Sequence, residues 1–303
     1  MPSPLTPNPS PLKPGFSHNA PIYALCLGES EDYVYSGGGD CLVAKWNLKT
    51  GAQEPFVVRA ESAVYALVLE PDSHLLFIGC SDGKLHVIDT STKQEVKAWT
   101  LHQAGIFDLK IDRSRGRLLA AGGDGVLSVW DLPSLTLLRT VPLSSGKLRQ
   151  LELSPDNELL AIADNQGPVH VLDAEHFSTV NTLTSHADGA TAVAWHPTKP
   201  ILISGGKDAY LRCWNRSNDF AEVLSIAAHQ SSIYSIVFWP DGAHMATASR
   251  DKTIKYWDAA TLDPLKRIDY AAGGHRHSVN KLVIAGEVLI SASDDRNLQV
   301  HRV

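Results

Sequence analysis

Apolar and polar residues alternate in short segments that recur along the chain at a nearly constant spacing. Seven of these segments have the two-residue period of a strand with one buried face. They cover residues 22–27, 64–69, 106–111, 148–153, 191–195, 233–238 and 279–284. A second apolar segment follows each one and ends in turn residues, as in LLFIGCSD and VLISASDD. The pattern therefore predicts an all-β chain.

Each repeat also carries a turn residue that is followed six residues later by a larger side chain. The strong copies are Asp40 to Trp46, Asp124 to Trp130, Asp208 to Trp214 and Asp251 to Trp257. The weaker copies are Asp82 to Ile88, Gln166 to Leu172 and Asp295 to His301. Successive turn residues are separated by 42, 42, 42, 42, 43 and 44 positions. A period in this range is the signature of a repeat architecture, so the chain is expected to contain seven similar units.

Turn chemistry divides each repeat into four strands. Pro155-Asp156 and Pro240-Asp241-Gly242 mark the turn between the first and second strands. The third strand ends at the large side chain, and the fourth, as in residues 95–101, is more polar and suits an exposed outer edge. Each unit is therefore predicted to be a four-stranded antiparallel blade.

Dipeptides at fixed places in the repeat resemble those of the WD-repeat family. Trp130-Asp131 and Trp257-Asp258 are literal WD pairs, and Gly274-His275 is a literal GH pair. The resemblance extends over nearly the whole chain and implies a seven-bladed β-propeller over residues 18–303. It also implies the function that we expect, which is a non-enzymatic scaffold for protein–protein interaction.

The resemblance assigns a structural role to a recurring set of histidine, serine or threonine, aspartate and tryptophan. In WD-repeat blades these side chains form a network that partners buried polar atoms. Complete sets are His18, Ser36, Asp40 and Trp46; His186, Ser204, Asp208 and Trp214; and His229, Thr247, Asp251 and Trp257. The third blade has Ala120 at the serine position, the seventh has His301 at the tryptophan position, and the second and fourth lack the network. A hydrolase triad uses similar residue types, but a catalytic set would occur once.

The resemblance also places partner binding on the top face of the propeller. The second residues of the inner strands, which lie on that face in the family, are Tyr23, Tyr65, Phe107, Arg149, Ala192 or its neighbour Thr191, Tyr234 and Asn280. Aromatic residues and arginine dominate binding hot spots; the alternative is that each ring packs against the adjacent blade. Lys147, Lys207 and Arg250 add positive charge nearby. The expected partner is a protein or peptide that is acidic and carries apolar anchors.

The first 17 residues are proline-rich and precede the first blade. The third strand of the seventh blade, at residues 298–303, is the last segment of the sequence, so this blade is expected to lack its own outer strand. Residues 10–16 are expected to supply that strand and close the ring, because an edge strand tolerates proline.

Composition narrows the classes of partner and the location. Lysine and arginine number 27 against 33 acidic residues, a net charge of -6, so no overall basic field favours nucleic acid or an acidic membrane. No apolar run approaches the roughly 18 residues of a membrane span, and no export signal is present at the amino terminus. Four scattered cysteines indicate free thiols in a reducing compartment. We expect a soluble cytoplasmic protein, with a nuclear location left open, that acts as a monomeric propeller within a complex.

Glycine and histidine clusters were tested for cofactor chemistry. Gly37-Gly38-Gly39 and Gly122-Gly123 lack the spacing of a phosphate loop and are expected to be turn glycines. His275, His277 and His301 are residues of a type that binds metals, but His275 already occupies a network position. We therefore expect no metal and no other cofactor.

The alternative to a scaffold is a propeller enzyme, a hydrolase or lyase with a polar site at the central channel. The nearest candidates are Asp108, Lys110, Gln150 and Glu152, which are polar residues in the inner strands of the third and fourth blades. A water-lined channel explains them as well. Convergence of Lys110 and Glu152 in a closed pocket, with a strongly perturbed carboxylate, would favour the enzyme.

Overall fold

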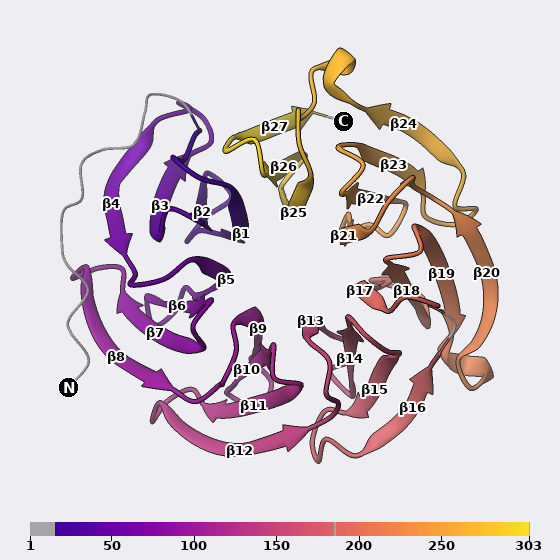
Figure 1. Cartoon of the computed structure of the whole chain (residues 1–303), viewed down its shortest axis with the longest axis horizontal. Coiled ribbons are helices and arrows are strands. Elements are labelled where there is room, and N and C mark those ends of the chain that lie inside the picture. Colours follow the sequence, from indigo (N-terminus) through magenta and orange to yellow (C-terminus); the bar gives the residue numbers. More distant parts are fainter. Residues whose placement is uncertain (1–15, 185, 303) are drawn as a thin grey trace.

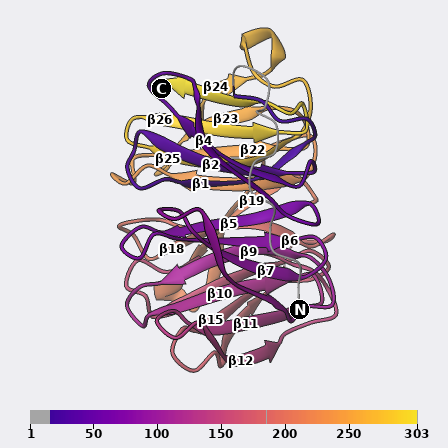
Figure 2. The same cartoon turned by 90° about the vertical axis from the view of Figure 1, so that its left-hand side faces the viewer.

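The seven repeats are arranged as blades around a common axis (Figure 1). A computed structural model describes residues 16–184 and 186–302. Each repeat folds into an antiparallel sheet whose first strand lies nearest the axis. Seen edge-on, the strands run from one face of the ring to the other (Figure 2). The predicted fold, a seven-bladed β-propeller built from four-stranded antiparallel blades, is confirmed.

The strands fall into four classes by their distance from the axis. The inner strands are β1 Ile22–Leu27, β5 Val64–Glu70, β9 Ile106–Asp112, β13 Leu148–Leu153, β17 Ala190–Trp195, β21 Ile233–Phe238 and β25 Val279–Ala285. The second strands are β2 Tyr33–Gly38, β6 Leu75–Cys80, β10 Arg117–Gly122, β14 Leu159–Asp164, β18 Ile201–Gly206, β22 His244–Ser249 and β26 Val288–Ser293. The third strands are β3 Leu42–Asn47, β7 Lys84–Asp89, β11 Val126–Asp131, β15 Val169–Asp173, β19 Tyr210–Asn215, β23 Ile254–Asp258 and β27 Leu298–Arg302. The outer strands are β4 Gln53–Arg59, β8 Gln94–Thr100, β12 Thr136–Pro142, β16 Thr179–Leu183, β20 Ala221–Ala227 and β24 Pro264–Ile268.

Helical structure in the described residues is confined to two 3-10 turns, η1 Arg216–Asn218 and η2 Tyr270–Ala272. Across residues 16–184 and 186–302, no helix is long and apolar enough to cross a membrane.

The first and last blades meet and close the ring. Strand β1 packs beside β25, so each inner strand contacts an inner strand on both sides. The segment before β1 also pairs with β27: Leu298 N–H donates to the Phe16 carbonyl at 2.7 Å, and His18 N–H donates to the Arg296 carbonyl at 2.8 Å. In the described ranges the seventh sheet has three strands, β25, β26 and β27. Of the segment predicted to complete this blade, residues 10–15 lie outside the described residues.

The hydrophobic core lies between neighbouring blades. One apolar cluster joins Tyr35 of the first blade to Leu67 and Ile78 of the second, and another joins Trp46 to Ile290 of the seventh. The sheets approach closely where a glycine faces the next blade. A Cβ atom on Gly37 would lie 2.4 Å from Val64 Cγ1, closer than any side chain tolerates.

Three of the five glycines that were predicted to lie in turns lie in strands instead. Gly37 and Gly122 lie inside strands β2 and β10, as Gly38 does, whereas Gly39 and Gly123 lie in turns. A Cβ atom on Gly122 would lie 2.2 Å from His102 Nδ1, so this glycine leaves room for the histidine. The expectation was correct only for the last glycine of each cluster.

The outer strands share an irregularity in the second to sixth blades. One residue of each outer strand has no partner opposite it in the third strand, which is the geometry of a β-bulge. These residues are Val96, Leu138, Val180, Val223 and Leu265. All five are aliphatic, and each is between 50% and 56% exposed.

Candidate functional site

A second set of bulges shapes the end of the channel where the inner strands begin. In all seven blades the second inner-strand residue falls between two paired residues and has no partner of its own in the second strand. A bulge turns the side chain out of the regular alternation. The seven residues are Tyr23, Tyr65, Phe107, Arg149, Thr191, Tyr234 and Asn280. Of the two residues considered for the fifth blade, Thr191 has this position and Ala192 does not.

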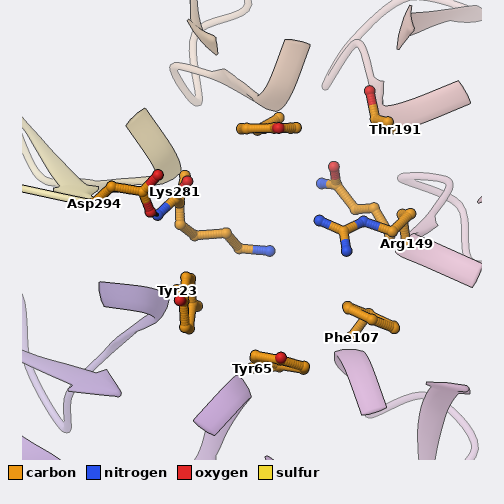
Figure 3. A pocket seen from close by; sticks show the side chains of 10 residues that line it. Tyr23, Tyr65, Phe107, Arg149, Thr191, Lys281 and Asp294 are labelled. Atoms are coloured by element: carbon orange, nitrogen blue, oxygen red, sulfur yellow. Dashed lines mark hydrogen bonds between the residues drawn. The ribbon is translucent and has the colours of Figure 1, made fainter. Parts of the chain in front are cut away.

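All seven bulged residues line one cavity of about 320 Å³, which is the upper mouth of the channel (Figure 3). Gln150, Lys281 and Asp294 complete its lining. The cavity lies at the lower end of the size range of ligand pockets, so it can enclose one or two side chains. The second-position residues predicted from the repeat are therefore brought together.

Three rings of the upper mouth form an aromatic row, which consists of Tyr23, Tyr65 and Phe107. The centroids of Tyr23 and Tyr65 are 5.4 Å apart with the rings edge to face, and those of Tyr65 and Phe107 are 5.2 Å apart with the rings stacked. The rings therefore pack on one another across three blades and also remain half-buried at the cavity. The packing of each ring against an adjacent blade is therefore observed for these three residues, and their contact with a partner stays a prediction.

Two cations reach into the upper mouth from opposite sides (Figure 3). The Arg149 guanidinium carbon lies 4.5 Å from the Phe107 ring centroid, a cation–π contact that extends the aromatic row. Lys281 Nζ lies 3.1 Å from Asp108 Oδ1. The other Asp108 oxygen accepts the backbone N–H of Leu151 at 2.9 Å. Asp108 therefore ties the third blade to both the fourth and the seventh.

An acidic group lies near the Lys281 side of the cavity. Asn280 Nδ2 donates to Asp294 Oδ1 and to the Ile22 carbonyl, both at 2.8 Å. Burial, together with the charge of Asp294 and the neighbouring Tyr65, raises the pKa of Tyr23. The Tyr23 phenol is therefore a neutral hydrogen-bond donor at physiological pH.

The three other basic residues predicted for the binding face lie outside this cavity. Lys147 is exposed, with Nζ 5.7 Å from the Phe107 ring centroid, so it flanks the aromatic row. Lys207 and Arg250 follow the second strands of the fifth and sixth blades and do not line the upper mouth. Lys281, in contrast, was missed. It has the same register as Asp108 and Gln150, and extending that comparison to the seventh blade would have identified it.

The predicted networks of the first, fifth and sixth blades are each joined by hydrogen bonds. In the first blade Trp46 Nε1–H donates to Ser36 Oγ at 2.7 Å, and His18 contacts Ser36 and Asp40 at 2.7 and 3.1 Å. Because the carboxylate only accepts, Nδ1 of the histidine carries the proton and Nε2 accepts from the hydroxyl. The same contacts measure between 2.7 and 3.0 Å in the other two blades.

Burial and hydrogen bonding set the charge states of these networks. Burial acts to raise the pKa of Asp208, but the charge of His186 and hydrogen bonds from Arg212 and His186 lower it below its usual value. Burial lowers the pKa of His186 and of His229, despite their carboxylate partners. His186 and His229 are therefore neutral bridges and not charged catalytic groups.

The third blade has a network that the sequence comparison missed. Ala120 occupies the serine position, but Ser128 lies directly opposite it on β11. Trp130 Nε1–H donates to Ser128 Oγ at 3.0 Å, and Ser128 contacts His102 Nε2 at 2.9 Å. The hydroxyl has moved to the cross-strand neighbour. A serine at this register, where the first blade has Ala44, was the available signal.

The seventh blade replaces tryptophan by histidine in the same network. His301 Nε2 lies 2.8 Å from Ser291 Oγ, and His275 connects that hydroxyl to Asp295. In the second and fourth blades a third-strand histidine pairs with an acid instead, His86 with Glu95 and His170 with Asp164. Within the described residues no group of three or more His, Cys, Asp or Glu side chains is arranged to hold a metal ion.

The four candidates for an enzyme site are divided between two roles. Gln150 Oε1 accepts the Val193 N–H at 3.3 Å, so it fastens neighbouring inner strands as Asp108 does. Lys110 Nζ and Glu152 Oε1 converge at 2.6 Å, but their side chains are 32% and 28% exposed. Burial acts to lower the pKa of Lys110, and ion pairing with Glu152 outweighs it and raises that pKa. The pair is therefore an open salt bridge between β9 and β13.

Lys110 and Glu152 belong to the opposite end of the channel. Two adjoining cavities of about 430 and 510 Å³ open there and form the lower mouth. Its lining combines aliphatic residues near the ends of the inner strands, including Leu27, Val237 and Val283, with charged residues such as Lys110 and Glu152.

The sequence was compared with known families and proteins. A family model described as "WD domain, G-beta repeat" matches residues 55–89, 93–131, 177–215 and 220–258, just over half of the chain. Striatin-4 of Homo sapiens is 25% identical over 263 residues, which cover 79% of this chain and 35% of that protein. Transcription factor unc-37 of Caenorhabditis elegans is 26% identical over 231 residues, which cover 76% of this chain and 37% of that protein. Eukaryotic translation initiation factor 3 subunit I of Saccharomyces cerevisiae is 26% identical over 216 residues, which cover 65% of this chain and 62% of that protein. The chain spans about a third of the length of Striatin-4.

Proposed function

Because the chain belongs to the WD-repeat family, we propose that it is a non-enzymatic scaffold that binds a protein or peptide on the face of the ring that contains the upper mouth. The observation that carries this proposal is the convergence of seven bulged side chains on one cavity. Such convergence concentrates the variable residues of seven repeats in one place. The relatives named an initiation factor subunit and a transcription factor are consistent with action inside larger assemblies.

The chemistry of the upper mouth supports a partner with apolar anchors and negative charge. The aromatic row offers rings that are fixed by one another, so little conformational entropy is lost when a partner contacts them. Arg149 lies inside the cavity and Lys147 lies beside it, whereas Lys207 and Arg250 are assigned a peripheral role in attracting the partner. Tyr234 and Asn280 complete the set of proposed contact residues.

Net charge and the cysteines support the exclusion of two classes of partner and an intracellular location. The net charge of -6 argues against direct binding of nucleic acid or an acidic membrane. The four cysteines are free thiols, which suits a reducing compartment inside the cell. We propose that the chain acts there as a single propeller within a complex.

Affinity purification followed by mass spectrometry tests the proposal. The baits are the parent chain, an upper-mouth variant with Tyr23→Ala, Tyr65→Ala and Phe107→Ala, and a lower-mouth control with Leu27→Ala, Val237→Ala and Val283→Ala. We expect a partner that the control retains and the upper-mouth variant loses. Melting curves show whether each variant is folded. Loss of the partner from the folded lower-mouth control alone would assign binding to the other face.

A further inference from the structure

Arg149 is a half-buried cation that has no counterion among the described residues. No carboxylate of the described residues lies within ion-pair distance of its guanidinium group, and no described acceptor takes a hydrogen bond from it. Asp108, an acidic residue on the neighbouring inner strand β9, already uses one carboxylate oxygen for Lys281 and the other for the Leu151 N–H. An arginine has five N–H donors, so Arg149 retains its full donor capacity inside the upper mouth.

The position of Arg149 is fixed although its donors are free. Its guanidinium group lies on the Phe107 ring, with 4.5 Å from the guanidinium carbon to the ring centroid, and Phe107 is stacked on Tyr65. This contact holds the guanidinium group over the ring and uses none of its N–H donors for a hydrogen bond within the described residues. A planar, preorganised fork of this kind matches the two oxygens of a carboxylate.

Gln150 adds a second donor beside Arg149. Its Oε1 accepts the Val193 N–H, and its Nε2 group donates to no acceptor of the described residues. Gln150 lines the same cavity as Arg149. Arg149 and Gln150 of the fourth blade therefore both bring hydrogen-bond donors to the cavity that no acceptor of the described residues uses.

The remaining charges indicate how much negative charge the cavity accepts. Arg149 and Lys281 are positive, whereas Asp294 and the Asp108 carboxylate that contacts Lys281 are negative. The four formal charges cancel, so a single anion is accommodated more easily than a dianion. Asp294 lies across the cavity from Arg149 and repels an anion toward the arginine (Figure 3).

We propose that the upper mouth binds one carboxylate group of the partner, held by Arg149, with the carbon chain behind it in contact with the aromatic row. This deepens the proposed function and rests on it, because the partner carries the carboxylate. The group is either the side chain of a glutamate or aspartate or the free carboxyl terminus of a peptide. A phosphate ester is disfavoured, since it brings about two negative charges into a cavity whose own charges cancel.

The charge state of Arg149 agrees with this assignment. Burial lowers the pKa of the Arg149 guanidinium, and the more distant Tyr234, Tyr65 and Asp108 oppose that effect only in part. A desolvated cation without a nearby anion is costly, and a bound carboxylate relieves that cost.

Nuclear magnetic resonance titration of the 15N-labelled full chain tests the proposal. Four probes are used: N-acetyl-glutamate amide, N-acetyl-alanine, the neutral isostere N-acetyl-glutamine amide, and inorganic phosphate. The signals followed are Arg149 Nε–H and the backbone amides of Phe107 and Gln150. We expect saturable shifts with at least one carboxylate at roughly millimolar concentration, because so small a ligand makes few contacts. The neutral isostere should produce none.

Arginine variants supply the controls. Arg149→Met should weaken the binding of the carboxylate probe by about tenfold or more, the effect expected for a lost charge-assisted hydrogen-bonded pair. Arg149→Lys keeps the charge without the planar fork and should give an intermediate loss. Arg59→Met is the matched control, because Arg59 is an exposed arginine at the end of outer strand β4 and lies outside the cavity. It should leave the titration unchanged.

The outcomes separate this inference from the proposed function. The carboxylate that shifts the signals at lower concentration identifies the source, side chain or terminus. Phosphate binding as tightly as the better carboxylate would overturn the assignment, and so would equal titrations in the parent and Arg149→Met. If a purified partner loses affinity in Tyr65→Ala but not in Arg149→Met, the scaffold stands and the carboxylate site does not.

Discussion

The same seven inner strands line both mouths of the channel, yet the two mouths differ in chemistry. At the upper mouth each strand contributes its bulged residue, and the seven residues are of five types. Two positions further along the same strands, where the ladder is regular, the residues are Leu25, Leu67, Leu109, Leu151, Val193, Ile236 and Leu282. All of these are aliphatic and at most 6% exposed.

The difference shows how one repeat separates packing from recognition. A residue in the regular ladder faces the neighbouring blade, so its size and polarity are dictated by the core. A bulged residue leaves the ladder, and its side chain can change without altering the strand pairing. The regular positions therefore belong to the core, whereas the bulged positions of the upper mouth are free to differ from blade to blade.

The largest expected effect is on the free energy of unfolding, and it distinguishes two residues of β13. Leu151→Ala should reduce the free energy of unfolding by about 2 to 5 kcal/mol, because it leaves a cavity between blades. Arg149→Ala, two residues earlier, should change it by less than about 1 kcal/mol. Urea denaturation measures both. Equal losses of unfolding free energy would mean that the bulged residue also stabilises the fold.

Acid should weaken the seventh blade, where His301 replaces tryptophan. Burial lowers the pKa of His301 from 6.5 to about 4, and the charges of His275 and Lys266 act in the same direction. Between pH 6.5 and 4, His301 is therefore protonated in the unfolded chain and neutral in the folded chain. The resulting stability is fully present above pH 6.5 and is lost as the pH falls toward 4, by up to about 3 kcal/mol.

His301→Gln tests the origin of this pH dependence. Glutamine retains an N–H donor for Ser291 but does not titrate. Stability curves of the variant and the parent, measured between pH 4 and 7, should therefore diverge on the acid side. Parallel curves would show that other groups cause the acid sensitivity.

Removal of a network aspartate should have the next largest effect. Asp208→Ala leaves the buried His186 without its acceptor and should cost about 1 to 3 kcal/mol of stability. Asp131, in the turn after β11, accepts only from the exposed Ser134 among the described residues, so Asp131→Ala should cost less. Thermal denaturation compares the two turns. An Asp208→Ala chain as stable as the parent would contradict the structural role of the network.

Truncation in the aromatic row should act on binding rather than on folding. Tyr65→Ala removes a ring that contacts both Tyr23 and Phe107, and it should speed dissociation of a partner about tenfold. Val68→Ala, in the same strand but at the lower mouth, is the matched control. Surface plasmon resonance with a purified partner gives both rate constants, and equal effects would remove the distinction between the mouths.

The smallest effect is expected outside the cavity. Lys207→Glu should slow association a few-fold and reduce its salt dependence, because the residue acts only through a field screened over about 8 Å. The dissociation rate should change little. A large change in that rate, measured at two ionic strengths, would place Lys207 within the contact surface.

The fold was predictable because the turn recurs at a constant spacing in all seven blades and, in five of them, satisfies the same kind of buried polar atoms. The Asp40 to Trp46 spacing recurs wherever that turn recurs, so its count gave the number of blades. Conservation of the hydrogen bond does not require conservation of the residue, however, and Ser128 supplies from β11 the hydroxyl that Ala120 lacks on β10. Only the strand register shows that these two residues are opposite each other.

The upper mouth was predictable in part for a similar reason. Its second-position residues share a place in the repeat, so resemblance located them. Lys281 and Asp294 enter from the seventh blade at other positions, and their importance depends on what lies across the channel. The isolation of Arg149 is likewise a property of distances to Asp108 and Lys281, which the order of residues along the chain does not specify.

The half-exposed residues of the outer strands bear on how such rings behave at high concentration. An unbroken outer strand is a template on which another chain can add a strand, and successive additions lead to aggregates. At Val96, Leu138, Val180, Val223 and Leu265 the strand bends out of register. The interruption leaves no long straight edge for lateral growth. The outer edges of the second to sixth blades are therefore protected against the addition of a strand from another chain.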